Sequence, residues 1–178
     1  MASKYDHLGE TLINFIQEQK IFFTGTAGKE GRVNVSPKGM DTLRVTNDRE
    51  VVWLNLTGSG NETAAHVLEN QRMTLMFCSF KEKPMILRLY GKAKMIPRGS
   101  GRWEEYAGLF PSFTGSRQFF VLSIELVQTS CGFAVPEYTF LGERDTLTKW
   151  ADSRGEEGIR NYWEEKNKQS LDGKPTGM

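Results

Sequence analysis

Short β-rich stretches recur along most of this chain, and turn-forming residues separate them. Valine, isoleucine, threonine and aromatic residues fill the stretches, whereas glycine, lysine, asparagine and aspartate fill the gaps. Many short strands with hairpin turns and few crossover helices favour an antiparallel barrel over an alternating β–α sheet. We therefore predict a mainly β (α+β) fold with strands over residues 21–26, 32–36, 43–46, 51–55, 73–80, 85–96 and 118–128.

Helical patterns flank these strands. Residues 8–19 follow the 3.6-residue period of an amphipathic helix, and shorter helices are predicted over 61–70 and 103–107. From about residue 143 the chain becomes charged and helical, and we expect residues 170–178 to be loose. The length fits one domain over residues 1–178, with a helical C-terminal extension.

Composition narrows the class of partner. Hydrophobic residues make up 38% and charged residues 25% of the chain, and the formal net charge is +1. Basic and acidic residues alternate, so no tail or stripe points to nucleic acid or to a membrane surface. Apolar runs are far shorter than the roughly 20 residues that span a bilayer. Cys78 and Cys131 fit no metal or redox spacing, and we expect a cytoplasmic protein without a signal peptide.

The segment 55–63 lies between a predicted strand and a predicted helix and carries glycines at 58 and 60. Ser59 and Glu62 have the spacing of a capping box, which predicts the helix start. Unpaired N–H groups and the helix dipole can hold a phosphate there, and Ser59, Asn61 and Thr63 add side-chain donors. An ordinary capped helix is the alternative, because the spacing is neither a Walker A loop nor GxGxxG.

Strand 32–36 alternates polar and apolar residues, which places Arg32, Asn34 and Ser36 on one face. We expect Pro37 to end the strand and direct Lys38 into a loop. This polar row could bind a ligand or be the wet face of an edge strand.

Arg88 interrupts an apolar strand: it either points to solvent or needs an anionic partner. His66 is expected to pack or to form a hydrogen bond. No catalytic triad, metal-ligand cluster or carboxylate pair is present, so the catalytic residues stay unassigned and a catalyst built this way would need a cofactor.

Three segments in order, 32–39, 55–63 and 88–91, resemble the FMN-binding split-barrel proteins of the pyridoxamine 5'-phosphate oxidase-like family. Two later segments, 128–136 and 166–173, resemble one branch of that family. The resemblance covers nearly the whole chain. It implies a six-stranded antiparallel split β-barrel with flanking helices, a homodimer, and FMN held between the subunits.

The resemblance also implies a site. Strand 34–36 would lie against the flavin ring, the loop 58–63 would hold the phosphate, and Lys38 would stand near the ring or the substrate. The expected FMN contacts are Arg32, Asn34, Val35, Ser36, Lys38, Asn55, Ser59, Asn61, Glu62, Thr63, Arg88 and Cys131.

Two departures argue against vitamin B6 oxidation. Glu62 and Thr63 stand where true pyridoxamine phosphate oxidases have arginine and lysine, and the tail 173–176 lacks their Arg-x-His residues. We therefore expect an FMN-dependent oxidoreductase acting on another small molecule. The alternatives are a flavin-binding or storage protein without turnover, and a barrel that binds deazaflavin or haem.

Overall fold

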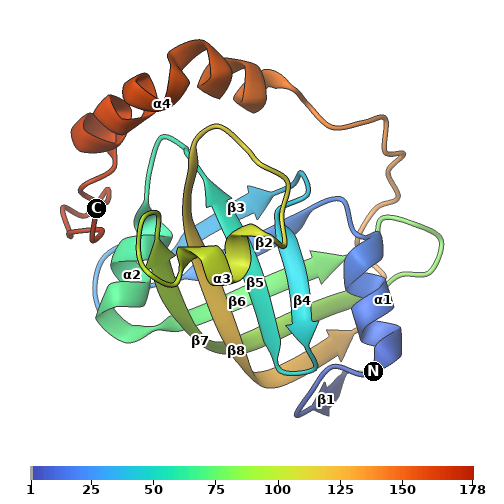
Figure 1. Cartoon of the computed structure of the whole chain (residues 1–178). Coiled ribbons are helices and arrows are strands. Elements are labelled where there is room, and N and C mark those ends of the chain that lie inside the picture. The colour runs from blue at the N-terminus through green and yellow to red at the C-terminus, as the bar shows by residue number, and fades with distance from the viewer. Residues whose placement is uncertain (1) are drawn as a thin grey trace.

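The computed structural model describes residues 2–178 (Figure 1). Its helices are α1 (Glu10–Glu18), α2 (Glu62–Asn70), α3 (Trp103–Ala107) and α4 (Thr146–Lys166). Its strands are β1 (Ser3–Tyr5), β2 (Phe22–Thr26), β3 (Asn34–Lys38), β4 (Leu43–Asn47), β5 (Glu50–Leu56), β6 (Arg72–Cys78), β7 (Ile86–Pro97) and β8 (Ser116–Ser130).

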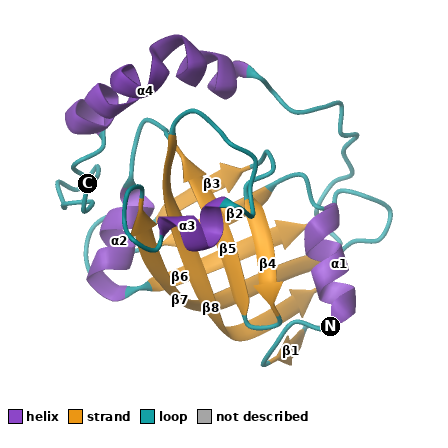
Figure 2. Ribbon diagram, viewed as in Figure 1, coloured by secondary structure: helices purple, strands orange, loops and turns teal. Residues whose placement is uncertain are grey.

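All strand pairs are antiparallel, and they form one curved sheet in the order β3-β2-β6-β7-β8-β5-β4, with β1 added beside β8 (Figure 2). The predicted α+β class with an antiparallel barrel is confirmed, although the described chain has eight strands instead of six. The strand that the sequence pattern did not predict, β1, has only three residues, all exposed, so no apolar alternation signals it.

The long strands β7 and β8 pair over twelve positions and hold the sheet together. Their register shifts between Tyr90 and Gly91, where the two backbones approach closely. A Cβ atom at position 91 would lie 2.0 Å from the Ser123 carbonyl oxygen, so this approach requires glycine. Glu125 is the unpaired residue of this bulge, which bends β8 and lets the sheet curl around its core.

Inward-facing aliphatic and aromatic side chains fill the barrel. Trp53 stacks on Phe120 with ring centroids 5.0 Å apart, and Phe22 stacks on Phe77 at 5.9 Å. A smaller cluster centred on Phe119 packs under α3. This core fixes the positions of β3, β5 and β8, whose ends border the candidate site described below.

The helix α4 arches over one end of the barrel and returns the C-terminus to the side of α2 (Figure 1). Gly155, with a φ of 62°, interrupts its helical geometry. Among residues 2–178 no helix is long and apolar enough to cross a bilayer.

Candidate functional site: a cationic cavity at the end of the barrel

A cavity of about 280 Å³ opens where β3, the end of β5 and the start of α2 meet. Eight of the twelve residues predicted to bind a cofactor line it, together with residues that the sequence did not single out. The eight are Asn34, Ser36, Lys38, Asn55, Ser59, Asn61, Glu62 and Thr63. The fold therefore gathers the two predicted segments, 32–39 and 55–63, into one site.

The strand β3 contributes one polar face to this cavity. Asn34 and Ser36 point inward, and the Asn34 amide donates to Thr63 Oγ1 at 3.2 Å. The prediction that Pro37 ends the strand is wrong, because β3 continues to Lys38, which pairs with Phe22. As an edge strand, β3 has a neighbour on one side only and tolerates the missing N–H of proline.

The predicted capping box at the start of α2 is also wrong. The N-cap is Asn61, not Ser59, and no side chain caps the helix. The Asn61 side-chain oxygen instead accepts from Gln118 Nε2 at 2.7 Å, and the Glu62 carboxylate accepts from the Leu171 N–H at 2.9 Å. The positive end of α2 thus lies beside the cavity without an acidic or hydroxyl cap.

Arg117, the second residue of β8, is the main site residue that the sequence analysis missed. It is 3% exposed, and its Nη1 donates to Asn167 Oδ1 at 2.7 Å and to the Gly60 carbonyl at 3.2 Å. Its Nε has no partner among residues 2–178. Burial lowers the pKa of Arg117 to about 10, and the guanidinium remains charged at neutral pH.

Lys38 is the second cation of the cavity. Its Nζ lies 5.1 Å from the centroid of the Trp53 ring. Burial, and then repulsion from Arg117, lower the pKa of Lys38 to about 8. No carboxylate of residues 2–178 forms an ion pair with Lys38 or Arg117. Glu62 also lines the cavity, and its charge raises the pKa of Arg117, but it forms an ion pair with neither cation. Two cations against one carboxylate leave the cavity with a net positive charge.

Buried amides orient the arginine. When the Asn55 amide turns its oxygen toward Arg117, that oxygen accepts from Arg117 Nη2 at 2.9 Å and from Gln118 Nε2 at 3.1 Å. Gln118 is fully buried, yet its Oε1 has no partner among the described residues. The buried amide network beside Arg117 therefore leaves two polar atoms, Arg117 Nε and Gln118 Oε1, without a partner among residues 2–178.

The C-terminal segment, predicted to be loose, instead packs on the loop 58–60. Asn167 and Thr176 are fully buried. The Asn167 amide donates to the Gly58 carbonyl at 3.1 Å, and Thr176 Oγ1 donates to the Asn167 carbonyl at 2.5 Å. One turn earlier, in the last part of α4, Trp163 Nε1 donates to Thr57 Oγ1 at 2.7 Å. The contacts of Asn167 and Trp163 join residues 109 and 106 positions apart, and they fix the loop that borders the cavity.

Four predicted site residues lie outside this cavity. Arg32 is mostly exposed and pairs with Asp172, and Val35 points outward from β3. Arg88 lies on the outer face of β7, where its Nη1 donates to Ser130 Oγ at 3.2 Å. Cys131 is exposed just after β8, and backbone hydrogen bonds, the largest from Phe133, lower its pKa. His66, as predicted, is buried and bonds to Thr26 Oγ1 at 3.0 Å.

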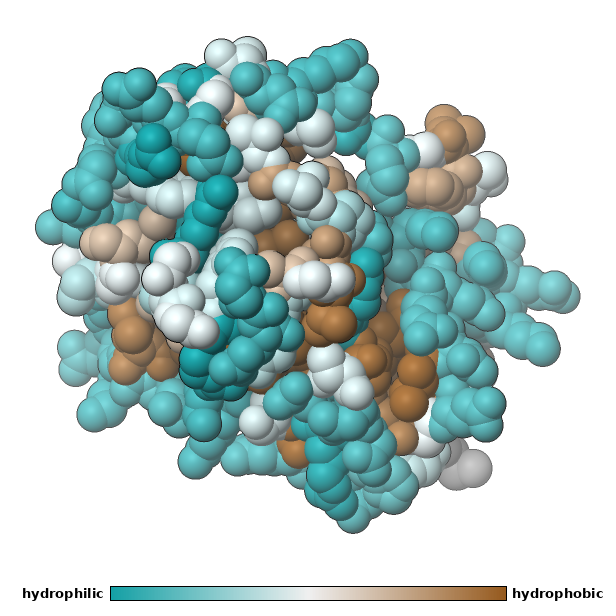
Figure 3. All heavy atoms as spheres, in the orientation of Figure 1, coloured by the Kyte–Doolittle hydropathy of each residue, from teal (hydrophilic) through white to brown (hydrophobic). Residues whose placement is uncertain are grey.

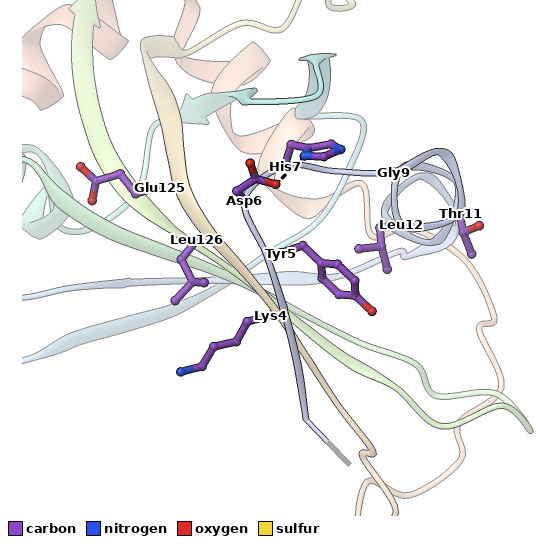
Figure 4. A pocket seen from close by; sticks show the side chains of 9 residues that line it. All are labelled: Lys4, Tyr5, Asp6, His7, Gly9, Thr11, Leu12, Glu125 and Leu126. Atoms are coloured by element: carbon purple, nitrogen blue, oxygen red, sulfur yellow. Dashed lines mark hydrogen bonds and ion pairs between the residues drawn. The ribbon is translucent and has the colours of Figure 1, made fainter.

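Another hollow, of about 760 Å³, lies at the far end between β1, the start of α1 and β8 (Figure 4). Its side chains diverge: Lys4 and Glu125 lie on one side of β1 and Tyr5 and Leu12 on the other, and Asp6 bonds to His7 at 2.6 Å. No set of donors converges there, so the cationic cavity is the better binding site.

Comparison with known proteins places the chain in a family. The profile of the pyridoxamine 5'-phosphate oxidase family matches residues 8–131. The chain is 35% identical over 191 residues to the pyridoxamine 5'-phosphate oxidase family protein ustO of Aspergillus flavus, covering 96% of this chain and 76% of ustO.

Solved structures agree in fold. A protein of Lactobacillus delbrueckii, described as a candidate pyridoxamine 5'-phosphate oxidase, superposes with a TM-score of 0.55 at 17% identity, over 69% of this chain and 94% of its own. HupZ of Group A Streptococcus superposes with a TM-score of 0.54 at 16% identity, over 68% and 98% of the two chains. On the profile match and the similarity to ustO, the chain belongs to the pyridoxamine 5'-phosphate oxidase family.

Proposed function

We propose that this protein binds FMN, with the phosphate of the cofactor in the cationic cavity. The observation that carries the proposal is the pair of cations, Lys38 and Arg117, which have no carboxylate partner among residues 2–178. Keeping a buried cation such as Arg117 without an anionic partner is costly, and the half-buried Lys38 adds a second positive charge, so the site favours a bound anion.

The donors around the cavity suit a phosphate. The guanidinium of Arg117 retains a free N–H, α2 presents its uncapped N-terminus, and Ser59 and Thr63 add hydroxyl groups. Such charge-assisted hydrogen bonds are the strong ones for an oxyanion. Glu62, the carboxylate in this lining, is held by the Leu171 N–H and is separated from Arg117 by more than ion-pair distance.

The size of the cavity indicates which part of FMN it takes. Pockets that enclose a whole ligand typically measure about 300 to 1,000 Å³, whereas this one measures about 280 Å³. It suits the phosphate end, and the flavin ring would extend along β3, where Asn34 and Ser36 offer polar groups and Lys38 a cation.

A homodimer would complete the site. Val33 and Val35 are 72% and 65% exposed on and just before the edge strand β3, on the face opposite Asn34 and Ser36. Apolar side chains on an unpaired strand edge favour a covering partner. We propose that a second copy of the chain covers this edge and encloses the flavin ring.

The reaction we propose is electron transfer to or from a small molecule. Bound FMN would supply the redox chemistry, which no side chain provides alone. The chain's own contribution would be to bind and orient the flavin, while Lys38, with a pKa near 8, could hold or release a proton at Nζ near neutral pH. Vitamin B6 oxidation is not proposed, because the tail cation Lys174 is already paired with Glu69.

The test is a titration of the purified protein with FMN and with riboflavin, which lacks the phosphate. Two or more charge-assisted hydrogen bonds, at roughly 1.5–3 kcal/mol each, predict at least about 100-fold weaker binding of riboflavin. Equal affinities for the two flavins, or no binding of either, would refute the phosphate assignment.

Three further measurements complete the test. The visible spectrum of the isolated protein distinguishes flavin from deazaflavin or haem. Reduction by NADH or NADPH, followed by turnover of an added acceptor, separates an oxidoreductase from a storage protein. Sedimentation tests the dimer.

A further inference from the structure

A second and larger cavity, of about 1260 Å³, lies beside the cationic one. Its walls come from the end of α1, the start of β2, the end of β3, the turn after β6, the segment that joins β8 to α4, and the first turns of α4. Residue 38 is the one lining residue that it shares with the cationic cavity. Ligands in the two cavities would therefore meet at Lys38.

Aromatic side chains dominate this second cavity. They come from four different elements and include Phe23, Phe80, Tyr138, Phe140 and Trp150. The rings of Phe80 and Tyr138 are 5.4 Å apart, and the Tyr138 N–H donates to the Phe80 carbonyl at 3.0 Å, which ties the joining segment to the barrel. Aromatic rings gathered from several segments around one cavity suit a flat apolar molecule, because they can stack on its faces.

These rings are not hidden in the protein core. Tyr138 and Phe140 are 67% and 52% exposed, and Figure 3 shows apolar atoms on the outer bend of the segment that joins β8 to α4, at the upper right. Exposed aromatic side chains gathered around a cavity mark a binding surface more often than a structural one.

The charged residues around the cavity are mostly cations: Lys20, Lys38, Lys81 and Arg144, against Glu18 and Glu143. Lys81 is paired with Glu18 at 3.6 Å, whereas Lys20, Lys38 and Arg144 form no ion pair with a carboxylate of residues 2–178. Lys20 Nζ lies 5.8 Å from the centroid of the Phe140 ring, so one free cation sits directly beside an aromatic wall. A ligand that satisfies both features is aromatic and negatively charged.

We propose that the second cavity is the substrate site and takes a planar aromatic molecule with a carboxylate, sulfonate or similar anionic group. The aromatic part lies against Phe140, the anionic group pairs with Lys20, and Lys38 marks the end that faces the cofactor. This inference rests on the proposed function, because it assigns the cationic cavity to FMN and leaves the larger one free for substrate.

The experiment uses two fluorescent probes with the same ring skeleton. The first is 1-anilinonaphthalene-8-sulfonate, an aromatic anion, and the second is N-phenyl-1-naphthylamine, which lacks the sulfonate. Each is titrated into the full-length protein before and after saturation with FMN. We expect the anionic probe to bind once per chain, more tightly than the neutral one, and to bind in the presence of FMN.

Variants locate the probe. Phe140→Ala removes an aromatic wall and should weaken the anionic probe about tenfold, since stacking and buried area are both lost. Lys20→Met removes an exposed cation and should weaken it about three- to fivefold, without affecting the neutral probe. Phe133→Ala is the matched control, because Phe133 is 81% exposed and lines neither cavity. FMN affinity should be unchanged in all three variants.

Three results would overturn the proposal. The two probes could bind with equal affinity, or the affinity of the anionic probe could be unchanged in Phe140→Ala. The probe could also bind only to dissociated monomers, which would mean that a second copy of the chain fills the cavity. Failure of the FMN assignment would be visible separately. In that case FMN would not bind, while the probe would still respond to the Phe140 and Lys20 variants.

Discussion

Replacing Arg117 with methionine is the most direct perturbation of the proposed phosphate site. Methionine keeps much of the apolar length of the side chain and removes the guanidinium. The lost charge-assisted hydrogen bonds are worth roughly 1.5–3 kcal/mol. Each 1.4 kcal/mol corresponds to a tenfold change in affinity. We therefore expect the Kd for FMN to rise about 10- to 150-fold.

The size of the effect follows from the burial of Arg117. At 3% exposure, water cannot replace the guanidinium or screen its charge as it would at the surface. The same substitution also removes the bonds to Asn167 and to the Gly60 carbonyl, at 2.7 and 3.2 Å. Affinity must therefore be measured alongside the stability of the apo protein.

The assay is quenching of FMN fluorescence on titration with protein, at fixed ionic strength. Arg72→Met is the matched control, because Arg72 is exposed at the start of β6 and does not line the cavity. Riboflavin binding provides the internal reference, and it should change much less than FMN binding in Arg117→Met. If Arg117→Met melts as a folded protein and binds FMN as tightly as the parent, the phosphate lies elsewhere and the reasoning from buried charge is wrong.

Three other predictions follow from named contacts. FMN affinity should fall as the pH rises through about 8, because Lys38 then loses its proton, and Lys38→Arg should abolish this fall. In the apo protein, Lys38 should make the free energy of unfolding rise between about pH 8 and the unfolded pKa of lysine near 10.4. In that range the unfolded chain binds more protons than the folded one. Gly91→Ala should lower the free energy of unfolding by more than about 3 kcal/mol in urea titrations, because the alanine Cβ would lie 2.0 Å from the Ser123 carbonyl oxygen. A loss below about 1 kcal/mol would contradict this close approach. Trp163→Phe should cost about 1 kcal/mol of stability, seen as a lower urea midpoint, because it removes the donor to Thr57 Oγ1; an unchanged midpoint would mean that this tether of α4 contributes nothing.

The helices and strands could be predicted from local patterns in the sequence. The β-rich stretches between turn residues located seven of the eight strands to within a few positions. The 3.6-residue period located α1, and the change to a charged composition indicated α4. Two of the incorrect details lie at ends of elements. Pro37 stays inside β3 because that strand is at the sheet edge, and Ser59 does not cap α2 because Asn61 and Glu62 are held by distant partners.

What the sequence determined by itself is the set of elements, the family resemblance and the two polar segments, 32–39 and 55–63, since these depend on neighbours along the chain. Only the tertiary structure decided which groups meet. It brought Arg117 and Asn167 to the glycine loop across 57 and 109 residues, ordered the tail, and turned Arg88 to the outer face of β7. Such contacts depend on how strands pair and cross at long range, and no local period in a sequence records that.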